Sequence, residues 1–350
     1  MRPVLLPPNI IEHFYRGGAK LAALRGVDLT SPRRPEEWLA ATVHRAGEPG
    51  VGLSRTVSGG IFADLVAADR AGWTGAESGG PGAGPADTGI LVKLLDPAQR
   101  LPVHVHPDRE FAQLHLHSCY GKTEAWYVLA VEGDDPSVWV GLSADVEPDE
   151  LARRVDAQDS DWLLAHLNKI PVRPGDGILV PSGAAHATGA GVFVLEIQEP
   201  TDFSILLEWS VTTATRDESH LGLGFDRALR AVRHTATSVD ELDGLRRHTS
   251  AEGRWDQPAS VLPAAADPFF RVSVVAPVPG AEVSVVGGYA VVVVLDGTGE
   301  LRAADSSPAV PVRRGEVWAV PAGFGDWSVA GDVRLTVCRP GDGWPGNLSR

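Results

Sequence analysis

The sequence predicts a mainly β protein: two similar β-barrels, a helical insertion in the first, and a helical segment connecting them. Three observations predict this class. Short apolar runs rich in β-branched residues, separated by Gly and Pro turns, recur over residues 90–211 and 251–350. The stretch between them, residues 216–249, has mostly helical spacing. A strand–turn–strand motif occurs once in each β-rich part, which indicates a repeated unit.

The repeated motif has the form Gly-x5-Pro-x-Gly-x2, followed by a polar residue. One copy runs from Gly175 to His186 and the other from Gly315 to Asp326. Each copy indicates a turn, a short buried strand and a second turn, because Pro cannot donate to a ladder and Gly accepts any φ. The equal spacing favours two similar barrels, of which only the first keeps the His. A generic pair of turns is the alternative, since short motifs are easily matched.

The N-terminal segment, residues 1–89, is expected to contribute strands and a helix to the first barrel. Residues 36–44 are typical of a strand, and residues 61–73 have the apolar spacing of a helix. Residues 75–89 are rich in Gly, Pro and Ala, which predicts a flexible surface loop.

The remaining domain boundaries follow changes in this pattern. The first barrel, which carries the metal site, is predicted over residues 90–215. Its helical insertion is placed at about 148–167, where Asp and Glu stand near the start. Residues 216–250 are the predicted helical connector, and residues 251–350 form a second barrel without metal ligands.

Composition excludes several classes of function. The net charge of −14 over 350 residues argues against binding to nucleic acid or to an anionic membrane surface. Only two cysteines, Cys119 and Cys338, are present, so a disulfide framework and a Cys-rich zinc site are excluded. Prolines interrupt the apolar N-terminus, and no apolar run reaches the roughly 20 residues of a membrane span. We expect a cytoplasmic monomer or homodimer with a small-molecule partner.

Three His and one Glu form a candidate metal site. His104 and His106 are two residues apart, so on a strand their side chains share a face. Glu124 begins the next strand-like run, and His186 ends the first copy of the repeated motif. A lone His is usually structural, but two or three imidazoles with one carboxylate suit a divalent metal with room for substrate or water.

Other conspicuous residues have simpler explanations. His115 and His117 form a rival same-face pair, but they precede a turn and are expected in a solvated loop, although the assignment could be reversed. Arg153–Arg154 and Arg246–Arg247 are expected on solvated helix faces. Packing in the core or against helices, rather than sugar stacking, is the expected role of four aromatic residues: Trp126, Tyr127, Trp139 and Trp162.

Four segments, in order, resemble the type I mannose-6-phosphate isomerases of the cupin superfamily. They are LPVHVHPD (101–108), GKTEAWYVL (121–129), GDGILVPSGAAHA (175–187) and LEIQEPTD (195–202). The similarity spans about residues 14–230, and the repeated motif extends it to the end. The resemblance implies two cupin-like (jelly-roll) barrels. It also implies an aldose–ketose isomerase that interconverts mannose 6-phosphate and fructose 6-phosphate by proton transfer through a cis-enediol.

The resemblance also implies roles for individual residues. One Zn²⁺ per chain would be held by four side chains, the first of which is usually Gln in the family: His104, His106, Glu124 and His186. Lys122 and Glu196 would be catalytic, and Lys93 and Glu36 would contact the substrate. Lys122 lies two residues from Glu124, so on a strand it shares the face of a predicted ligand. Glu196 would be either the base or a hydrogen-bond partner of the sugar.

One position departs from the family pattern. The family has an Arg thought to act in catalysis where this chain has Leu206. An aliphatic side chain can neither hold an anion nor stabilise an enediolate. Either another residue supplies the charge, for which Arg16 is one candidate, or the substrate and the chemistry have changed. The alternatives are a related isomerase or epimerase acting on a different or unphosphorylated sugar, and a non-catalytic sugar-binding cupin.

Overall fold

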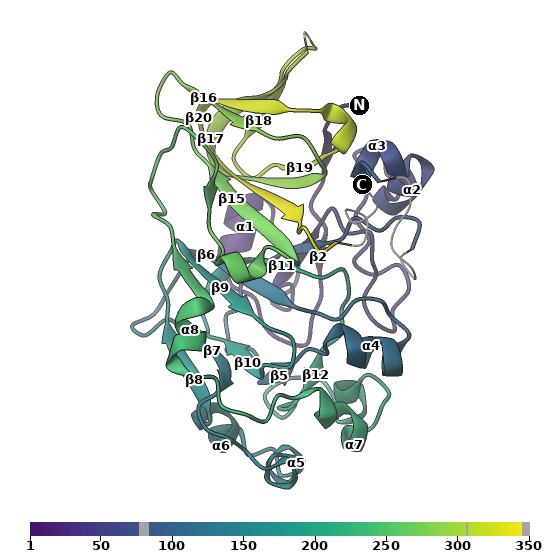
Figure 1. The fold of residues 1–350 in the computed structure, drawn as a ribbon, viewed down its shortest axis with the longest axis vertical. Helices are drawn as coiled ribbons and strands as arrows, with labels where there is room; N and C mark the ends of the chain where they lie inside the picture. The colour runs from purple at the N-terminus through teal and green to yellow at the C-terminus, as the bar shows by residue number, and fades with distance from the viewer. Residues whose placement is uncertain (77–83, 306, 345–350) are drawn as a thin grey trace.

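The computed structural model describes residues 1–76, 84–305 and 307–344. Its paired strands are antiparallel and form sheets of five, seven and eight strands. In Figure 1 the eight-stranded sheet makes up the upper part of the molecule, and the other two sheets lie below it. The predicted mainly β class is confirmed. Of the predicted loop 75–89, residues 77–83 lie outside the described residues.

The five-stranded sheet places three sequence-distant residues in one row. Its strands, in spatial order, are β12 (Ile205–Leu206), β5 (His104–Val105), β10 (His186–Thr188), β7 (Ser137–Leu142) and β8 (Leu167–Pro171). His104 is directly opposite His186 on one side and Leu206 on the other. Directly opposed residues of an antiparallel pair project to the same face, so these three side chains are neighbours.

The seven-stranded sheet separates a polar face from an apolar face. Its order is β13 (Arg246–His248), β9 (Asp176–Val180), β6 (Glu124–Ala130), β11 (Phe193–Gln198), β4 (Leu91–Leu95), β3 (Glu36–Leu39) and β2 (Ile10–Ile11). Glu196 is opposite Lys93 on one side and Trp126 on the other, so these three share a face. Because side chains alternate along a strand, Leu195 and Ile197 project to the opposite face.

One edge strand of the eight-stranded sheet, β1, comes from the N-terminal segment. Its strands are β1 (Val4–Leu6), β14 (Ala259–Ser260), β15 (Phe270–Val275), β16 (Glu282–Val285), β17 (Ala290–Ala303), β18 (Val310–Arg313), β19 (Val317–Val320) and β20 (Trp327–Pro340). Val4 pairs with Ala319, so β1 belongs to this sheet and not to the first barrel, where residues 1–89 were predicted. Three apolar residues alone do not reveal which distant strand they will pair with.

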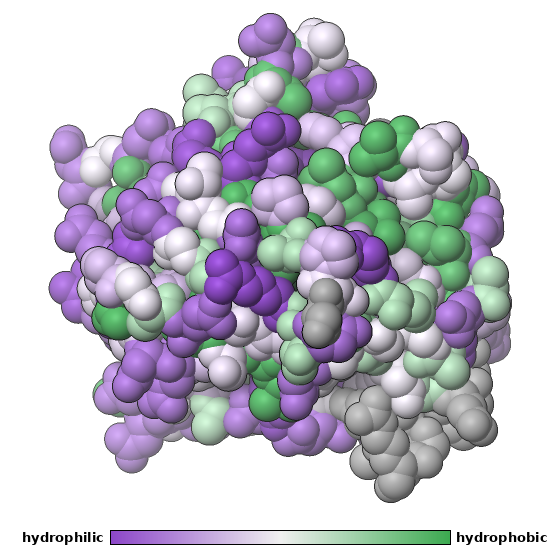
Figure 2. Space-filling view, turned by 90° about the horizontal axis from the view of Figure 1, so that it is seen from above, coloured by the Kyte–Doolittle hydropathy of each residue, from purple (hydrophilic) through white to green (hydrophobic). Residues whose placement is uncertain are grey.

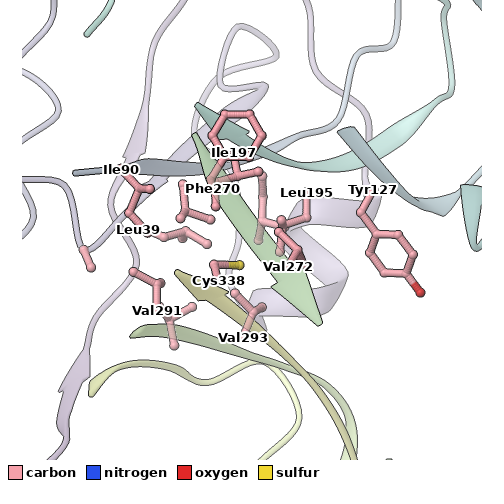
Figure 3. Close-up of a cluster of buried hydrophobic side chains, with 14 of the residues drawn as sticks. Leu39, Ile90, Tyr127, Leu195, Ile197, Phe270, Val272, Val291, Val293 and Cys338 are labelled. Carbon is pink, nitrogen blue, oxygen red and sulfur yellow. The ribbon is translucent and has the colours of Figure 1, made fainter. Parts of the chain in front are cut away.

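A continuous apolar core joins the seven-stranded and eight-stranded sheets. Figure 3 shows side chains of both sheets meeting in it: Leu39, Leu195, Ile197, Phe270, Val272, Val291, Val293 and Cys338. Each large apolar side chain buried in this way contributes about 1.5–3 kcal/mol. The two parts of the molecule are therefore held together by a shared core.

The helices are short and lie around the sheets. They are α1 (Lys20–Arg25), α2 (Phe62–Ala68), α3 (Arg70–Thr74), α4 (Arg109–Leu116), α5 (Pro148–Asp156), α6 (Ser160–Ala165), α7 (Phe225–Ala228) and α8 (Val239–Gly244). Among the described residues, none of these helices has both the length and the apolar character needed to cross a bilayer.

Two helical predictions hold but divide in two. The insertion at 148–167 contains α5 and α6, and α6 begins where the carboxylate of Asp159 accepts a hydrogen bond from Trp162 N at 3.2 Å. The segment 61–73 breaks at Asp69, whose non-helical main chain (φ −144°, ψ +68°) ends α2 and whose side chain caps α3 through Gly72 N. In both places a capping Asp inside the apolar pattern starts a new helix.

Three local predictions are wrong. The strand expected over 36–44 ends at Leu39, because Ala40 has φ +48° and leaves the extended conformation. His115 lies in helix α4 and His117 caps its end, so this pair is not in a loop. Arg246–Arg247 lie on the exposed strand β13, not on a helix, because their main chain pairs with β9.

The two copies of the repeated motif share their main-chain geometry. Gly175 has φ +95° and Gly315 has φ +84°. Gly175 N donates to Val128 O at 2.9 Å, and Gly315 N donates to Val294 O at 2.8 Å. The matching hydrogen bonds support a repeated unit, while the domain boundaries remain predictions.

Viewed from above, the molecule has a mixed surface. In Figure 2 hydrophilic side chains cover most of this face, and hydrophobic ones gather toward one side of it. Apolar atoms contribute a large share of any folded protein's surface, so this distribution alone does not identify a partner.

Candidate active site

The four predicted ligands converge at one buried point. His104 lies on β5, His106 just after it, Glu124 at the start of β6 and His186 at the start of β10. One ligand atom from each of the four lies within 4.8 Å of the others. All four side chains are buried. We call these four residues the metal-ligand set.

Main-chain carbonyls orient all three imidazoles in the same way. In each ring Nδ1 is 2.8 Å from a carbonyl oxygen: His104 to Pro102, His106 to Phe203, and His186 to Ala184. A carbonyl can only accept, so each Nδ1 carries the proton and each Nε2 keeps a lone pair. Metal-binding His residues are commonly oriented by this kind of contact.

The chemistry of these side chains fits a divalent metal. Burial and neighbouring charges lower the pKa of His104, and burial and Lys122 lower that of His106 to about 3. Burial raises the pKa of Glu124, but Lys122 and His106 outweigh it and hold the pKa well below its usual range. His186 Nε2 is buried, makes no hydrogen bond and lies 3.4 Å from the Glu124 carboxylate. Neutral imidazoles and an ionised carboxylate are the donors that such a metal takes.

Lys122 is in direct contact with the metal-ligand set. Its Nζ lies 2.7 Å from His106 Nε2 and also hydrogen-bonds the carboxylate of Glu124. Both partners are candidate metal ligands, so a metal ion and the Lys122 ammonium compete for the same atoms. Metal binding would therefore free the ammonium to contact a substrate.

A second charged cluster surrounds Lys93 on the polar face of the seven-stranded sheet. Its Nζ lies 3.8 Å from Glu36, 3.6 Å from Glu196 and 3.5 Å from Asp202, and 4.7 Å from the Trp38 ring centroid. Burial lowers the pKa of Lys93, but the carboxylates outweigh it and raise the pKa above its ordinary value. Lys93 is therefore held as a cation.

Glu196 lies between Lys93 and the metal-ligand set. Its carboxylate accepts a hydrogen bond from Trp126 Nε1 at 3.1 Å. Burial and the charge of Glu124 raise the pKa of Glu196 to about 7, against the opposing effect of Lys122 and Lys93. A carboxyl group that titrates near neutral pH is suited to accepting and returning a proton.

Glu36 is ionised and fully engaged. Tyr15 OH donates to it at 2.8 Å and Trp38 Nε1 at 3.2 Å. Burial raises its pKa, but His13, Lys93 and these hydrogen bonds together lower it to about 2.

Comparisons with known proteins identify relatives in sequence and in fold. No family model matches the chain. A Bacillus subtilis protein named a probable mannose-6-phosphate isomerase is 28% identical, over 97% of this chain and 99% of its own length. A mannose-6-phosphate isomerase of the same species is 26% identical, over 71% of this chain and 74% of its own length. A crystal structure of the mannose 6-phosphate isomerase from Bacillus subtilis aligns with TM-score 0.71 and 24% identity, covering 97% of this chain and 100% of that one.

The chain resembles the mannose-6-phosphate isomerase family in sequence and in fold. The resemblance read from the four segments is confirmed, and the fold is the cupin fold of that family.

Two residues concern the positive charge that the family has and that this chain lacks: Leu206 and Arg16. Leu206 is buried directly opposite His104, so an aliphatic side chain borders the metal-ligand set. Arg16 is exposed, and its Nε donates to Gln99 Oε1 at 3.2 Å rather than to a residue of the buried site. The contact with Gln99 does not link Arg16 to the buried site, so its role in binding substrate stays a prediction.

The structure adds residues that the sequence did not single out. His13 and Tyr15 contact Glu36 from a segment without a recognisable pattern. Asp202, beside Lys93, ends the quoted segment LEIQEPTD, and that position was the available signal. Trp126 is buried as expected, but its indole N–H also binds Glu196.

Proposed function

We propose that this chain is a zinc-dependent aldose–ketose isomerase that interconverts mannose 6-phosphate and fructose 6-phosphate through a cis-enediol. The observation that carries the proposal is the convergence of the metal-ligand set with Lys122 and Glu196 in one buried site. The substrate is taken from the names of the relatives. Two unpaired cysteines support a cytoplasmic location.

Each side chain has a proposed part in the reaction. Bound to the metal-ligand set, one Zn²⁺ would supply an electrophile that stabilises negative charge on substrate oxygens. Glu196 carries the proton between carbons 1 and 2, and the Trp126 indole keeps its carboxylate in place. Lys122 supplies positive charge to a substrate oxygen. Lys93 and Glu36 hold sugar hydroxyl groups, and Arg16 remains the candidate for the phosphate.

A second candidate is favoured by Leu206. Because this side chain is aliphatic and lies beside His104, that position supplies no cation for an anionic group. An isomerase or epimerase acting on a different or unphosphorylated sugar would need none there.

The test is exchange of the carbon 2 proton, followed by NMR in heavy water with zinc-loaded protein and mannose 6-phosphate. We expect exchange together with fructose 6-phosphate formation. Removal of a general acid–base group costs about 10²–10⁴-fold, so Glu196→Gln should lose that much activity while keeping its metal. Lys122→Ala is expected to lose activity as well. Absence of exchange in protein shown to contain zinc would overturn the assignment, and mannose in place of its phosphate would then test the second candidate.

A further inference from the structure

A buried glutamate holds the main chain between Lys122 and Glu124. Both main-chain polar groups of Thr123 are bound by Glu199: its Oε2 accepts from Thr123 N at 3.0 Å, and its N donates to Thr123 O at 3.0 Å. The other carboxylate oxygen of Glu199 accepts from Arg109 Nε at 2.5 Å. Glu199 is almost completely buried, so the Arg is its compensating charge.

The same arrangement occurs beside His104. Glu208 Oε2 accepts from Val103 N at 2.8 Å, and Glu208 N donates to Val103 O at 3.1 Å. Arg100 binds both carboxylate oxygens of Glu208, at 2.7 and 2.6 Å. Val103 immediately precedes His104, which is a metal ligand in the proposed site.

We propose that Glu199 and Glu208 are positioning residues of the site, each fixing the main chain next to a metal ligand. Glu199 acts on Glu124 and Lys122 through Thr123, and Glu208 acts on His104 through Val103. This proposal deepens the proposed function. Its kinetic predictions rest on the proposed isomerase activity, whereas its metal-binding measurement needs no substrate.

The reason is geometric. A side chain follows its own main chain, so a residue whose N–H and C=O are both bound cannot rotate without breaking two hydrogen bonds. Hydrogen bonds to a charged acceptor are also stronger and shorter than neutral ones. Misplacement of a reacting group by about 1 Å costs on the order of 10²-fold in rate.

A third buried pair provides a matched control. Glu37 is paired with Arg25 at 2.8 Å and accepts from the main-chain N of Asn9 at 3.2 Å. It resembles the two positioning pairs in charge and burial. However, Glu37 is opposite Leu94, on the apolar face of the seven-stranded sheet and away from the metal-ligand set.

The experiment is a Co²⁺ titration of metal-free protein, followed by absorbance, with thermal unfolding recorded alongside. Glu199→Gln and Glu208→Gln keep an acceptor oxygen but lose the charge that strengthens the main-chain hydrogen bond. We expect them to weaken Co²⁺ binding by about 10-fold, the lower end of the usual effect of changing a group that orients a ligand. Glu37→Gln should leave Co²⁺ affinity unchanged even where it lowers the melting temperature. In turnover, kcat of Glu199→Gln should fall while KM changes little, because Lys122 and Glu124 remain present but misplaced.

Paired variants keep the test decisive if a single variant does not fold. E199M/R109M and E208M/R100M remove each ion pair whole, which proteins often tolerate, yet they still remove the acceptor of the main-chain N–H. E37M/R25M is their control. The proposal is overturned if the site variants bind Co²⁺ as tightly as the wild type, or if the control weakens binding equally. If the wild type binds Co²⁺ but does not convert mannose 6-phosphate, the proposed function is wrong. The Co²⁺ affinities of the site variants and the control can still be compared in that case.

Discussion

At the scale of single residues, the charged side chains of the buried site compensate one another. Lys93 faces three carboxylates, and Lys122 faces Glu124 and His106. A buried charge is costly alone, so removing one member exposes its partners to that cost. Substitutions here are therefore expected to affect stability as well as chemistry.

Glu36 gives this expectation a pH dependence. Its folded-state pKa is about 2, below the ordinary value of 4.5, so its interactions stabilise the fold above pH 4.5 and are lost as the pH falls toward 2. The depressed pKa corresponds to about 3 kcal/mol at neutral pH. Glu36→Gln should therefore be less stable than the wild type at pH 7, and the gap should close between pH 4.5 and 2. Urea unfolding of the metal-free proteins across that range measures it, and a gap independent of pH would contradict it.

The sequence predicts residues of the site when a short motif carries them. His104 and His106 were found because two residues on a strand share a face, and the motif spacing led to His186. Glu199 lies inside the quoted segment LEIQEPTD and Glu208 outside it, but the sequence reveals the role of neither, because that role is defined by main-chain partners in distant segments. His13 was not predicted for the same reason, because its contact with Glu36 joins two segments with unrelated sequence patterns.

At the scale of elements, glycines at the repeated turn are required by both φ and close packing. A Cβ on Gly315 would lie 2.2 Å from Leu24 O, in addition to the strain of φ +84°. Gly315→Ala should therefore lose more than the roughly 1–3 kcal/mol that backbone strain alone costs. Gly280→Ala is the matched control, since Gly280 has φ +82° but open space around its Cβ. Chemical unfolding of both variants measures the difference, and equal losses would mean that Leu24 simply moves away.

Elements were predictable where periodicity is long and local. The apolar strands β4, β6 and β11 lie within residues 90–211, where recurring β-branched runs predict strands. Boundaries were missed where one residue changes conformation, as at Ala40 and Asp69. Arg246–Arg247 form a strand only because β9 offers a free edge, which is information that the local sequence does not contain.

At the scale of the whole molecule, a bound metal should stabilise the fold by mass action. Its ligands come from β5, β6 and β10, which are scattered over about 80 residues, so unfolding separates them. A metal at 1,000 times its Kd adds about 4 kcal/mol to the free energy of unfolding. Chelation should lower the melting temperature, restored zinc should raise it, and His186→Ala should abolish the response. A melting temperature insensitive to chelator in protein that contained metal would contradict the ligand assignment.

The pairing of β1 with β19 has a consequence for how the protein is made. Val4 is synthesised before its partner Ala319, which follows more than 300 residues later. At about 5–20 residues per second, the first strand waits roughly 15–60 s for its partner. During that time the seven-stranded sheet can be completed, but its apolar face has no second sheet to cover it. In nascent chains this apolar face should therefore stay exposed until the residues of the eight-stranded sheet have been synthesised.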